Sequence, residues 1–518
     1  MKNAQDEHIA SLHALRGIAA LGVVILHLSE STPGLPIRNF TDIVANMLFA
    51  VDLFFVLSGV VMAAVYGAAF DECVRGSTYF RFLMARVARI WPMMILAATL
   101  AITAEWISNV AGTTVASTGG TFSSFLAEFF GLAGWFTWAW LNPPSWSLTA
   151  EFAVYLVAPL LILAFRRAPV PLCLATLAVA PLVPGILYGM ATAPFVDNPL
   201  GLNLPFGYTL LAPEAQWFWN MKGGFILTRG LSMFLCGLAL HRLARLGCLE
   251  RLSTLTTFLG ASAATLVALH AGLPRVLILF LLIALVATSL GRHMTNHAIF
   301  RHRTLHWLGE ISLGVYLIHW PLIQVARASY SMAFGTMIEE AGPLECLLFI
   351  LTVLLAVIAV ASWLYGIYEI PARRIIRAWG ERRLARTGKT TVFMTGGKKV
   401  ETLVLSASAF VLLVSIPFGI VTQGYWLREG WANQLPVITQ IRKEANDVVL
   451  ILDHQAPLPV RVAGWGDIDA VLGPHRRNAL VLKPGLPLQV TLVPRPMSTG
   501  QGGVELFAGR IHEKIELK

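Results

Sequence analysis

The sequence predicts an all-α polytopic membrane bundle of about eleven transmembrane helices, followed by a small β-rich extracytoplasmic domain at the C-terminus. Composition is the first reason: the 518 residues are 56% hydrophobic and only 13% charged, and the mean hydropathy is +0.67. Soluble domains carry roughly 25% charged residues. The second reason is that apolar stretches of about 20 residues, the length that crosses a bilayer as a helix, recur along the chain.

The apolar stretches also indicate how the chain is oriented. Basic clusters at 75–89, 166–167, 242–251, 292–303 and 373–399 follow alternate spans. With the N-terminus in the cytoplasm all five clusters fall on the cytoplasmic side, as the positive-inside rule requires. The N-terminus has no basic region or cleavage site, so we expect an uncleaved anchor in the inner membrane. The candidate spans are residues 9–28, 46–66, 88–107, 147–165, 170–190, 225–243, 253–271, 273–290, 310–328, 344–368 and 401–422.

These patterns divide the chain into four parts. We expect a ten-helix membrane domain over 1–378, a basic cytoplasmic linker over 379–400, the eleventh helix over 401–422 and the β-rich domain over 423–518. Short runs such as DVVLILD and LQVTLVP, separated by Gly and Pro, are typical of strands. This last domain shows no nucleophile motif, so we interpret it as a structural module or a docking site for a cell-envelope protein.

Charge and cysteine patterns argue against two classes of function. The net charge of +10 comes from clusters between apolar spans, so it orients the protein and does not indicate nucleic-acid binding. The five cysteines have no metal-ligand spacing, so we predict neither a metal site nor a disulfide framework. The Trp-rich segment 134–146 is typical of an aromatic belt, although the same rings near a polar substrate would stack on sugars.

The first span, LHALRGIAALGVVILH, carries Arg16 and His27 where lipid-facing sequence carries no ionisable group. Eleven residues at 100° each bring the two side chains to within about 20° of one another, separated by about 16 Å along the axis. We therefore expect them to share one face and to look into a polar cavity.

Two interpretations of this pair remain open. Arg16 alone can snorkel to the inner headgroups, and His27 alone can be an interfacial histidine bonded to a neighbouring helix. As a pair inside a bundle they mark a substrate or proton path. Arginine binds phosphate or carboxylate through two parallel hydrogen bonds, and histidine accepts a proton at neutral pH.

Seven stretches in order resemble landmarks of the membrane-bound acyltransferase-3 family, whose members O-acylate glycans and other extracytoplasmic acceptors. Together they cover about residues 9–378. They are LRGIAALGVVILH, VDLFFVLSGVVM, FRFLMARVARIWP, PSWSLTAEFAVYLVAP, RGLSMFLCGLAL, LGEISLGVYLIHWPLI and YEIPARRIIR.

The resemblance implies an enzyme that takes an acyl group, often acetyl, from cytoplasmic acyl-CoA and delivers it to a hydroxyl on the other face. Acyl-CoA is then a co-substrate, with no bound cofactor. On this reading Arg16 holds the anionic donor and His27 is the general base. Arg86 and Arg89, in the cytoplasmic basic cluster 75–89, either bind donor phosphates or serve only as a positive-inside flank.

Further residues of the landmarks each have a functional and a structural interpretation. Glu151 either supports His27 or pairs with a structural arginine, and His319 either binds substrate or bonds a backbone carbonyl freed at the Pro321 kink. Asp52 and Ser58-Gly59 are explained as a helix-start acid and a close-packing site. Donors for the tetrahedral oxyanion are proposed at Trp146 and Ser147 because they flank Glu151.

A proton-coupled transporter or flippase is the alternative function. Arg16, His27 and Glu151 would then form an intramembrane path. Transporters of this kind are built from inverted repeats with paired broken helices, and the sequence shows no corresponding halves.

Overall fold

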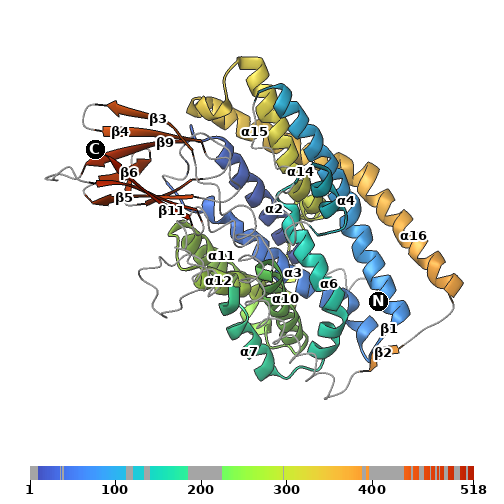
Figure 1. The fold of residues 1–518 in the computed structure, drawn as a ribbon. Helices are drawn as coiled ribbons and strands as arrows, with labels where there is room; N and C mark the ends of the chain where they lie inside the picture. Colours follow the sequence, from blue (N-terminus) through green and yellow to red (C-terminus); the bar gives the residue numbers. More distant parts are fainter. Residues whose placement is uncertain are drawn as a thin grey trace. The chain divides into compact units, whose positions relative to one another are not determined.

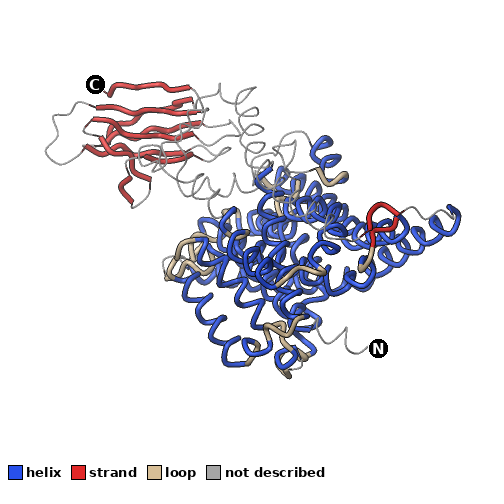
Figure 2. The backbone as a smooth tube through the Cα atoms, turned by 90° about the horizontal axis from the view of Figure 1, so that it is seen from below, coloured by secondary structure: helices blue, strands red, loops and turns tan. Residues whose placement is uncertain are grey.

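The computed structural model describes residues 10–35, 37, 40–112, 121–132, 141–184, 224–295 and 297–387, together with strands between 392 and 517. The chain divides into two compact units. The first contains the helices and a small two-stranded sheet, and the second contains the strands from residue 437 onward (Figures 1 and 2).

Ten helices of the first unit fall on the first ten predicted spans. Among the residues that the structure describes, six helical stretches are long and apolar enough to cross a membrane, as expected of a polytopic membrane protein. The predicted eleventh span, 401–422, lies outside the described residues. The ten helices are α2 (Ala10–Ser31), α3 (Ala50–Tyr66), α4 (Gly76–Val110), α6 (Ser145–Phe165), α7 (Val170–Val179), α10 (Gly224–Arg245), α11 (Leu255–His270), α12 (Arg275–Thr288), α14 (Arg303–Phe334) and α15 (Pro343–Leu364).

Several helices extend beyond their predicted bounds, among them α14, which does so at both ends. Helix α4 begins at Gly76. From the sequence we placed the basic cluster 75–89 between two spans, but its residues Arg86 and Arg89 both lie on this helix. Their charges lower the local hydropathy, but arginine is a good helix former. Helix α15 continues through a π-helical turn (Tyr365–Glu369) into α16 (Ile370–Thr387). A short helix, α5 (Thr121–Phe129), lies between the third and fourth spans.

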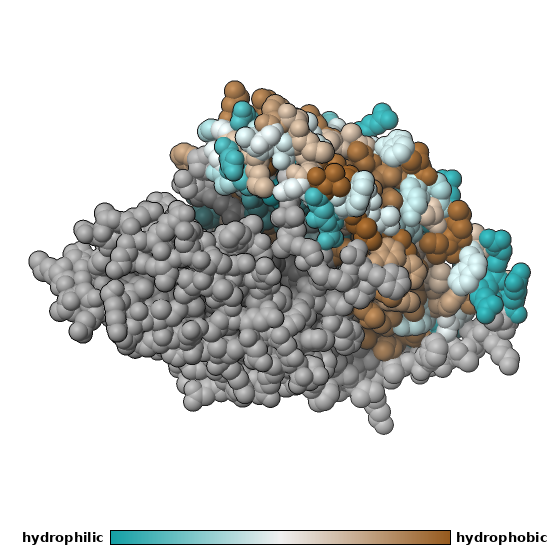
Figure 3. All heavy atoms as spheres, turned by 45° about the horizontal axis from the view of Figure 1, so that its top comes forward, coloured by the Kyte–Doolittle hydropathy of each residue, from teal (hydrophilic) through white to brown (hydrophobic). Residues whose placement is uncertain are grey.

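Much of the helical surface is apolar. Figure 3 shows apolar residues over a large part of the described surface on one side. On α15 the exposed apolar residues recur at helical spacing, which is typical of a face turned to lipid acyl chains. These residues are Leu344, Leu347, Leu348, Leu351 and Leu355.

Helices α2 and α14 pack backbone to backbone. A Cβ atom at Gly309 would lie 2.3 Å from the carbonyl oxygen of His13, and one at Gly17 would lie 3.0 Å from the amide nitrogen of Gly309. Ring pairs mark two levels of the contact, and their order along both helices means that α2 and α14 run parallel. They are His13–His306 at 4.8 Å and His27–His319 at 5.3 Å between centroids.

Helices α3 and α10 meet through a second pair of glycines. A Cβ at Gly59 would lie 2.2 Å from the carbonyl oxygen of Phe234, and one at Gly237 would lie 2.2 Å from that of Val56. The close-packing role predicted for Gly59 is therefore confirmed. Close contact between the two backbones holds α3 in place, and α3 supplies one wall of the site.

Strands join two loops of the helical unit. Strand β1 (Cys73–Arg75) pairs antiparallel with β2 (Val392–Thr395). Because hydrogen-bonded strands must lie on the same side of a membrane, the segment before α4 and the segment after α16 share one side. The positive-inside pattern predicts that this side is the cytoplasmic one.

The second unit contains two antiparallel sheets. One has the strand order β11-β10-β5-β8 and the other β3-β4-β9-β6-β7. Both sheets fall in the region where the sequence shows short β-like runs. The strands are β3 (Val437–Glu444), β4 (Asp447–Asp453), β5 (Val460–Gly466), β6 (Ile468–Leu472), β7 (His475–Arg477), β8 (Ala479–Leu482), β9 (Leu488–Pro494), β10 (Gly502–Ala508) and β11 (Ile511–Leu517).

Candidate active site

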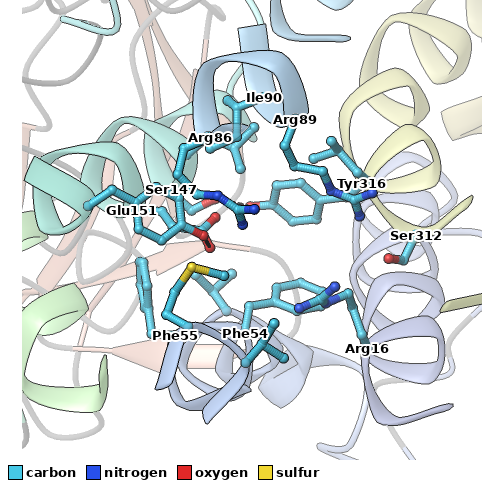
Figure 4. A pocket seen from close by; sticks show the side chains of 16 residues that line it. Arg16, Phe54, Phe55, Arg86, Arg89, Ile90, Ser147, Glu151, Ser312 and Tyr316 are labelled. Carbon is cyan, nitrogen blue, oxygen red and sulfur yellow. Dashed lines mark hydrogen bonds between the residues drawn. The ribbon is translucent and has the colours of Figure 1, made fainter. Parts of the chain in front are cut away.

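A cavity of about 100 Å³ lies among five helices of the first unit. Figure 4 shows the guanidinium groups of Arg16, Arg86 and Arg89 directed into it from α2 and α4. Aromatic rings from α3 and α14 form much of the remaining wall. The lining consists of Arg16, Val51, Phe54, Phe55, Val61, Met62, Arg86, Arg89, Ile90, Ser147, Leu148, Glu151, Tyr155, Ser312, Leu313 and Tyr316.

The cavity lining is cationic. Three arginines and one glutamate give it a net charge of +2. Cations buried away from water attract an anion more strongly than exposed ones, because the surroundings screen them less. The residues that line this space are therefore suited to an anionic ligand.

The three arginines differ in how they are held. Arg16 makes no hydrogen bond or ion pair within the described part of the chain. Arg86 donates to the Tyr66 hydroxyl at 2.8 Å, and its guanidinium lies over the rings of Tyr66 and Tyr155 at 5.2 and 5.7 Å. The Nε of Arg86 is buried and has no partner among the described residues. Arg16 and this nitrogen thus remain available to a ligand.

Arg89 belongs to an ion network at the edge of the cavity. Its guanidinium lies 3.5 Å from the carboxylate of Glu369, whose side chain is 1% exposed and also contacts Arg373. Glu369 ends the π-helical turn after α15, and such turns are frequent at functional sites. Glu369 therefore holds Arg89 in position from outside the cavity.

Glu151 is surrounded by hydroxyl groups. It accepts a hydrogen bond from Ser58 at 2.7 Å and another from Tyr155, and Ser58 and Tyr155 lie 2.9 Å apart. The hydrogen bonds described for Glu151 go to Ser58 and Tyr155 and not to His27 or to an arginine, so its predicted support of His27 and its predicted arginine partner both stay predictions. Helix α6 packs on α3 and α4, which brings Glu151 to the level of the arginines.

The carboxylate beside His27 is Glu30. Glu30 Oε2 lies 2.9 Å from His27 Nδ1, and the His27 side chain is 18% exposed. The His27 ring stacks on His319 and meets Trp320 edge-on at 5.4 Å. Its Nε2 makes no hydrogen bond to any residue that the structure describes. Histidine and glutamate three positions apart share a helix face, so this partner could be read from the sequence but was missed.

Arg16 and His27 both face α14, as the helical periodicity predicts. Arg16 shares the cavity with Ser312 and Tyr316, and His27 lies against His319. Neither side chain points to lipid. They do not share one cavity, however, because His27 is not part of its lining.

His319 does not bond the backbone carbonyl that Pro321 frees, which was the structural role considered for it. Pro321 has no N–H, so it leaves the carbonyl of Leu317 without its helical partner. Asn142 Nδ2 donates to that carbonyl at 2.9 Å. The carbonyls of Val315 and Tyr316 lie near the His319 ring, but neither ring nitrogen completes a hydrogen bond within the described residues.

Asn142 is itself held by a buried carboxyl on α5. The Glu128 Oε1 atom accepts from the backbone N–H of Asn142 at 2.8 Å. Burial raises the pKa of Glu128 to about 7, and hydrogen bonds to Asn142 and its neighbours oppose the rise. The short helix α5 thus holds Asn142 in position to bond the carbonyl that Pro321 frees in α14.

The two proposed oxyanion donors differ in what their polar groups contact. Trp146 lies under the guanidinium of Arg229 at 5.3 Å. Ser147 lines the cavity, but its hydroxyl is 2.8 Å from the Tyr316 hydroxyl and donates to the carbonyl of Pro144 at 3.2 Å. The contact with Arg229 involves the ring face of Trp146 and not its indole N–H, whereas Ser147 would have to give up a hydrogen bond to meet a developing negative charge.

Comparisons with known proteins point to one family. The model of the Acyl_transf_3 family, described as an acyltransferase domain, matches residues 9–366. Protein 2 in the picA locus of Rhizobium radiobacter is 36% identical over 100 residues, which are 19% of this chain and 47% of that protein. Acyltransferase MdmB of Streptomyces mycarofaciens is 30% identical over 172 residues, which are 31% of this chain and 41% of that protein. These matches span less than half of each relative, and no solved structure matches the chain.

Proposed function

The chain belongs to the Acyl_transf_3 family of acyltransferases, and from this premise we propose that it moves an acyl group from cytoplasmic acyl-CoA to a hydroxyl of an extracytoplasmic glycan. Acetyl is the acyl group that we propose. The observation that carries the proposal is the cationic cavity, with its unpaired Arg16, on the helix face that also bears the His27–Glu30 pair. An anion site and a carboxylate-supported imidazole are the two parts that such a transfer requires.

The donor site is the arginine cavity. Arg16, Arg86 and Arg89 bind the phosphates of acyl-CoA, because a guanidinium donates two parallel hydrogen bonds to phosphate oxygens. Glu151 organises the wall beside them through Ser58 and Tyr155. From there the flexible arm of the donor extends along α2 toward His27, about 16 Å away along the helix.

His27 carries out the proton transfer. Its Nε2 takes the proton of the acceptor hydroxyl while the hydroxyl oxygen attacks the carbonyl carbon of the thioester. The intermediate collapses as the C–S bond breaks, and the sulfur leaves with the bonding electrons and receives the proton from His27. Glu30, at Nδ1, fixes the tautomer and stabilises the imidazolium, as the carboxylate does in other acyl transfers.

The membrane orientation follows from the same proposal. The N-terminus and the β1–β2 side lie in the cytoplasm, where the donor is found, and the protein resides in the inner membrane. The acceptor meets the His27 end from the opposite side. The C-terminal strands then belong to an extracytoplasmic domain, available to a cell-envelope partner.

Replacing Arg16 with lysine is expected to raise the KM for acetyl-CoA about 10- to 100-fold. Lysine keeps the charge but loses the two-pronged geometry, which removes a charge-assisted hydrogen bond of about 1.5–3 kcal/mol. The measurement is acetyl transfer against acetyl-CoA concentration in membranes that contain equal amounts of each variant. Arg303, exposed at the start of α14, provides the matched Arg→Lys control, and equal KM values in both variants would mean that Arg16 does not bind the donor.

Mass spectrometry of the host's surface glycans, with and without the chain, tests the function as a whole. Acetyl esters should disappear when the chain is removed and return with the wild-type chain. Membranes that contain it should also transfer labelled acetyl from acetyl-CoA to glycan and release free coenzyme A. Unchanged glycans together with no acetyl-CoA-dependent labelling would contradict the proposal and favour a transporter.

A further inference from the structure

His319 is a buried histidine without a hydrogen-bonding partner. Its side chain is 0% exposed, and neither Nδ1 nor Nε2 is bonded to any group that the structure describes. A buried polar group left unpaired costs about 1–3 kcal/mol, and the large majority of buried side-chain polar atoms are paired. Two unpaired nitrogens on one fully buried ring suggest that a bound ligand supplies the missing hydrogen bond.

The position of His319 indicates what that partner is. Its ring stacks on His27 with 5.3 Å between centroids and 17° between planes. Its ring also lies 6.1 Å from the ring of Tyr316, which lines the arginine cavity. His319 thus contacts both a ring of the proposed donor site and the proposed base, and in our proposal the acyl thioester passes from the first to the second.

No local structural task accounts for the ring. The carbonyl of Leu317 that Pro321 frees is already bonded to Asn142. The groups around His319 that we have named are the imidazole of His27, the phenol of Tyr316 and the carbonyls of Val315 and Tyr316, and none of them completes a hydrogen bond to its nitrogens. A hydrophobic side chain of similar size would fill the space without leaving polar atoms unpaired.

We propose that His319 is a catalytic residue that donates an N–H hydrogen bond to the carbonyl oxygen of the acyl thioester. The inference rests on the proposed function and adds a group to its mechanism. A neutral imidazole carries one N–H donor. When the acceptor oxygen attacks the carbonyl carbon, the C=O π electrons move to oxygen, and this bond stabilises the resulting oxyanion until the C–S bond breaks.

The kinetic test separates catalysis from donor binding. Replacing His319 with leucine is expected to lower kcat about 10²- to 10³-fold, the effect of removing one oxyanion donor elsewhere. The dissociation constant of acetyl-CoA, measured on the purified full chain, should stay within about two-fold because the phosphate-binding arginines are intact. His319→Asn and His319→Gln retain an N–H donor, so at least one of them should recover part of kcat.

An infrared measurement tests the contact itself and needs no acceptor. Acetyl-CoA labelled with ¹³C at the thioester carbonyl is bound to the purified chain, and its carbonyl band is isolated by isotope difference. A hydrogen bond weakens the C=O bond, so the band should lie at lower frequency in the wild type than in the leucine variant. His302→Leu, at an exposed histidine that precedes α14, is the control and should retain the wild-type frequency.

The outcomes distinguish the inference from the function on which it rests. An inactive His27→Ala variant together with wild-type kcat and carbonyl frequency in His319→Leu would overturn the inference and leave the function in place. A wild-type chain that neither binds nor uses acetyl-CoA would overturn both. If the leucine variant fails to fold, His319→Phe, which keeps a ring but has no N–H donor, takes its place, and a wild-type carbonyl frequency in that variant refutes the contact.

Discussion

Replacing His27 with alanine is expected to abolish acylation of the acceptor while the amount of protein in the membrane stays the same. General base catalysis contributes about 10²- to 10⁴-fold to a rate, and the structure describes no second carboxylate-supported imidazole on this face of α2. The His27 side chain is 18% exposed and packs against rings on α14. Its loss should therefore affect chemistry more than folding.

The measurement is acetyl transfer from labelled acetyl-CoA to glycan in membranes adjusted to equal protein content. Glu30→Gln should lower the rate by a smaller factor than His27→Ala, since the imidazole remains but loses the carboxylate at Nδ1. His302→Ala, at an exposed position, is the matched control. Retained activity in the His27 variant would remove this residue from catalysis.

Replacing Asp52 with alanine should destabilise the folded membrane domain by about 3–5 kcal/mol, the typical result of breaking a buried ion pair from one side. Arg229 Nε and Nη2 donate to the two carboxylate oxygens of Asp52 at 2.7 and 2.6 Å. Their side chains are 2% and 10% exposed, and Trp146 packs under the guanidinium. The pair joins α3, α10 and α6, so its loss leaves a charged arginine among all three.

Thermal unfolding in detergent measures this effect, with membrane content as a second readout. The double variant Asp52→Leu/Arg229→Met should be more stable than Asp52→Ala, because it leaves no unpaired charge. If both single and double variants unfold at the wild-type temperature, the ion pair contributes nothing to the fold. If the two lose equal stability, the loss is one of packing and not of charge.

Hydropathy predicted the membrane helices because each span must satisfy its backbone within a fixed apolar thickness. It failed at the start of α4, where arginines lower the average although the helix continues. Periodicity within one helix was equally informative: Arg16 and His27 both face α14. The eleventh span and the roles of the site residues remain predictions.

Contacts between helices could not be read from the sequence. Glu151 was assigned to His27, but the packing of α6 on α3 brings it to Ser58. The carbonyl freed by Pro321 was anticipated, yet its partner Asn142 comes from a distant segment. Such contacts depend on how helices are stacked, and single-helix patterns do not contain that information.

The glycine contacts between α2 and α14 have a consequence for substrate selection. With backbone against backbone at Gly309, no flexible side chains lie between the helices to let one slide along the other. Arg16 and His27 both lie on α2, which separates them by about 16 Å along its axis, and the close contact keeps the α14 side chains opposite them at fixed levels. If the two residues act as we propose, the acyl carrier must bridge this separation, so carriers are selected by the length of the arm between the anionic end and the reactive carbon.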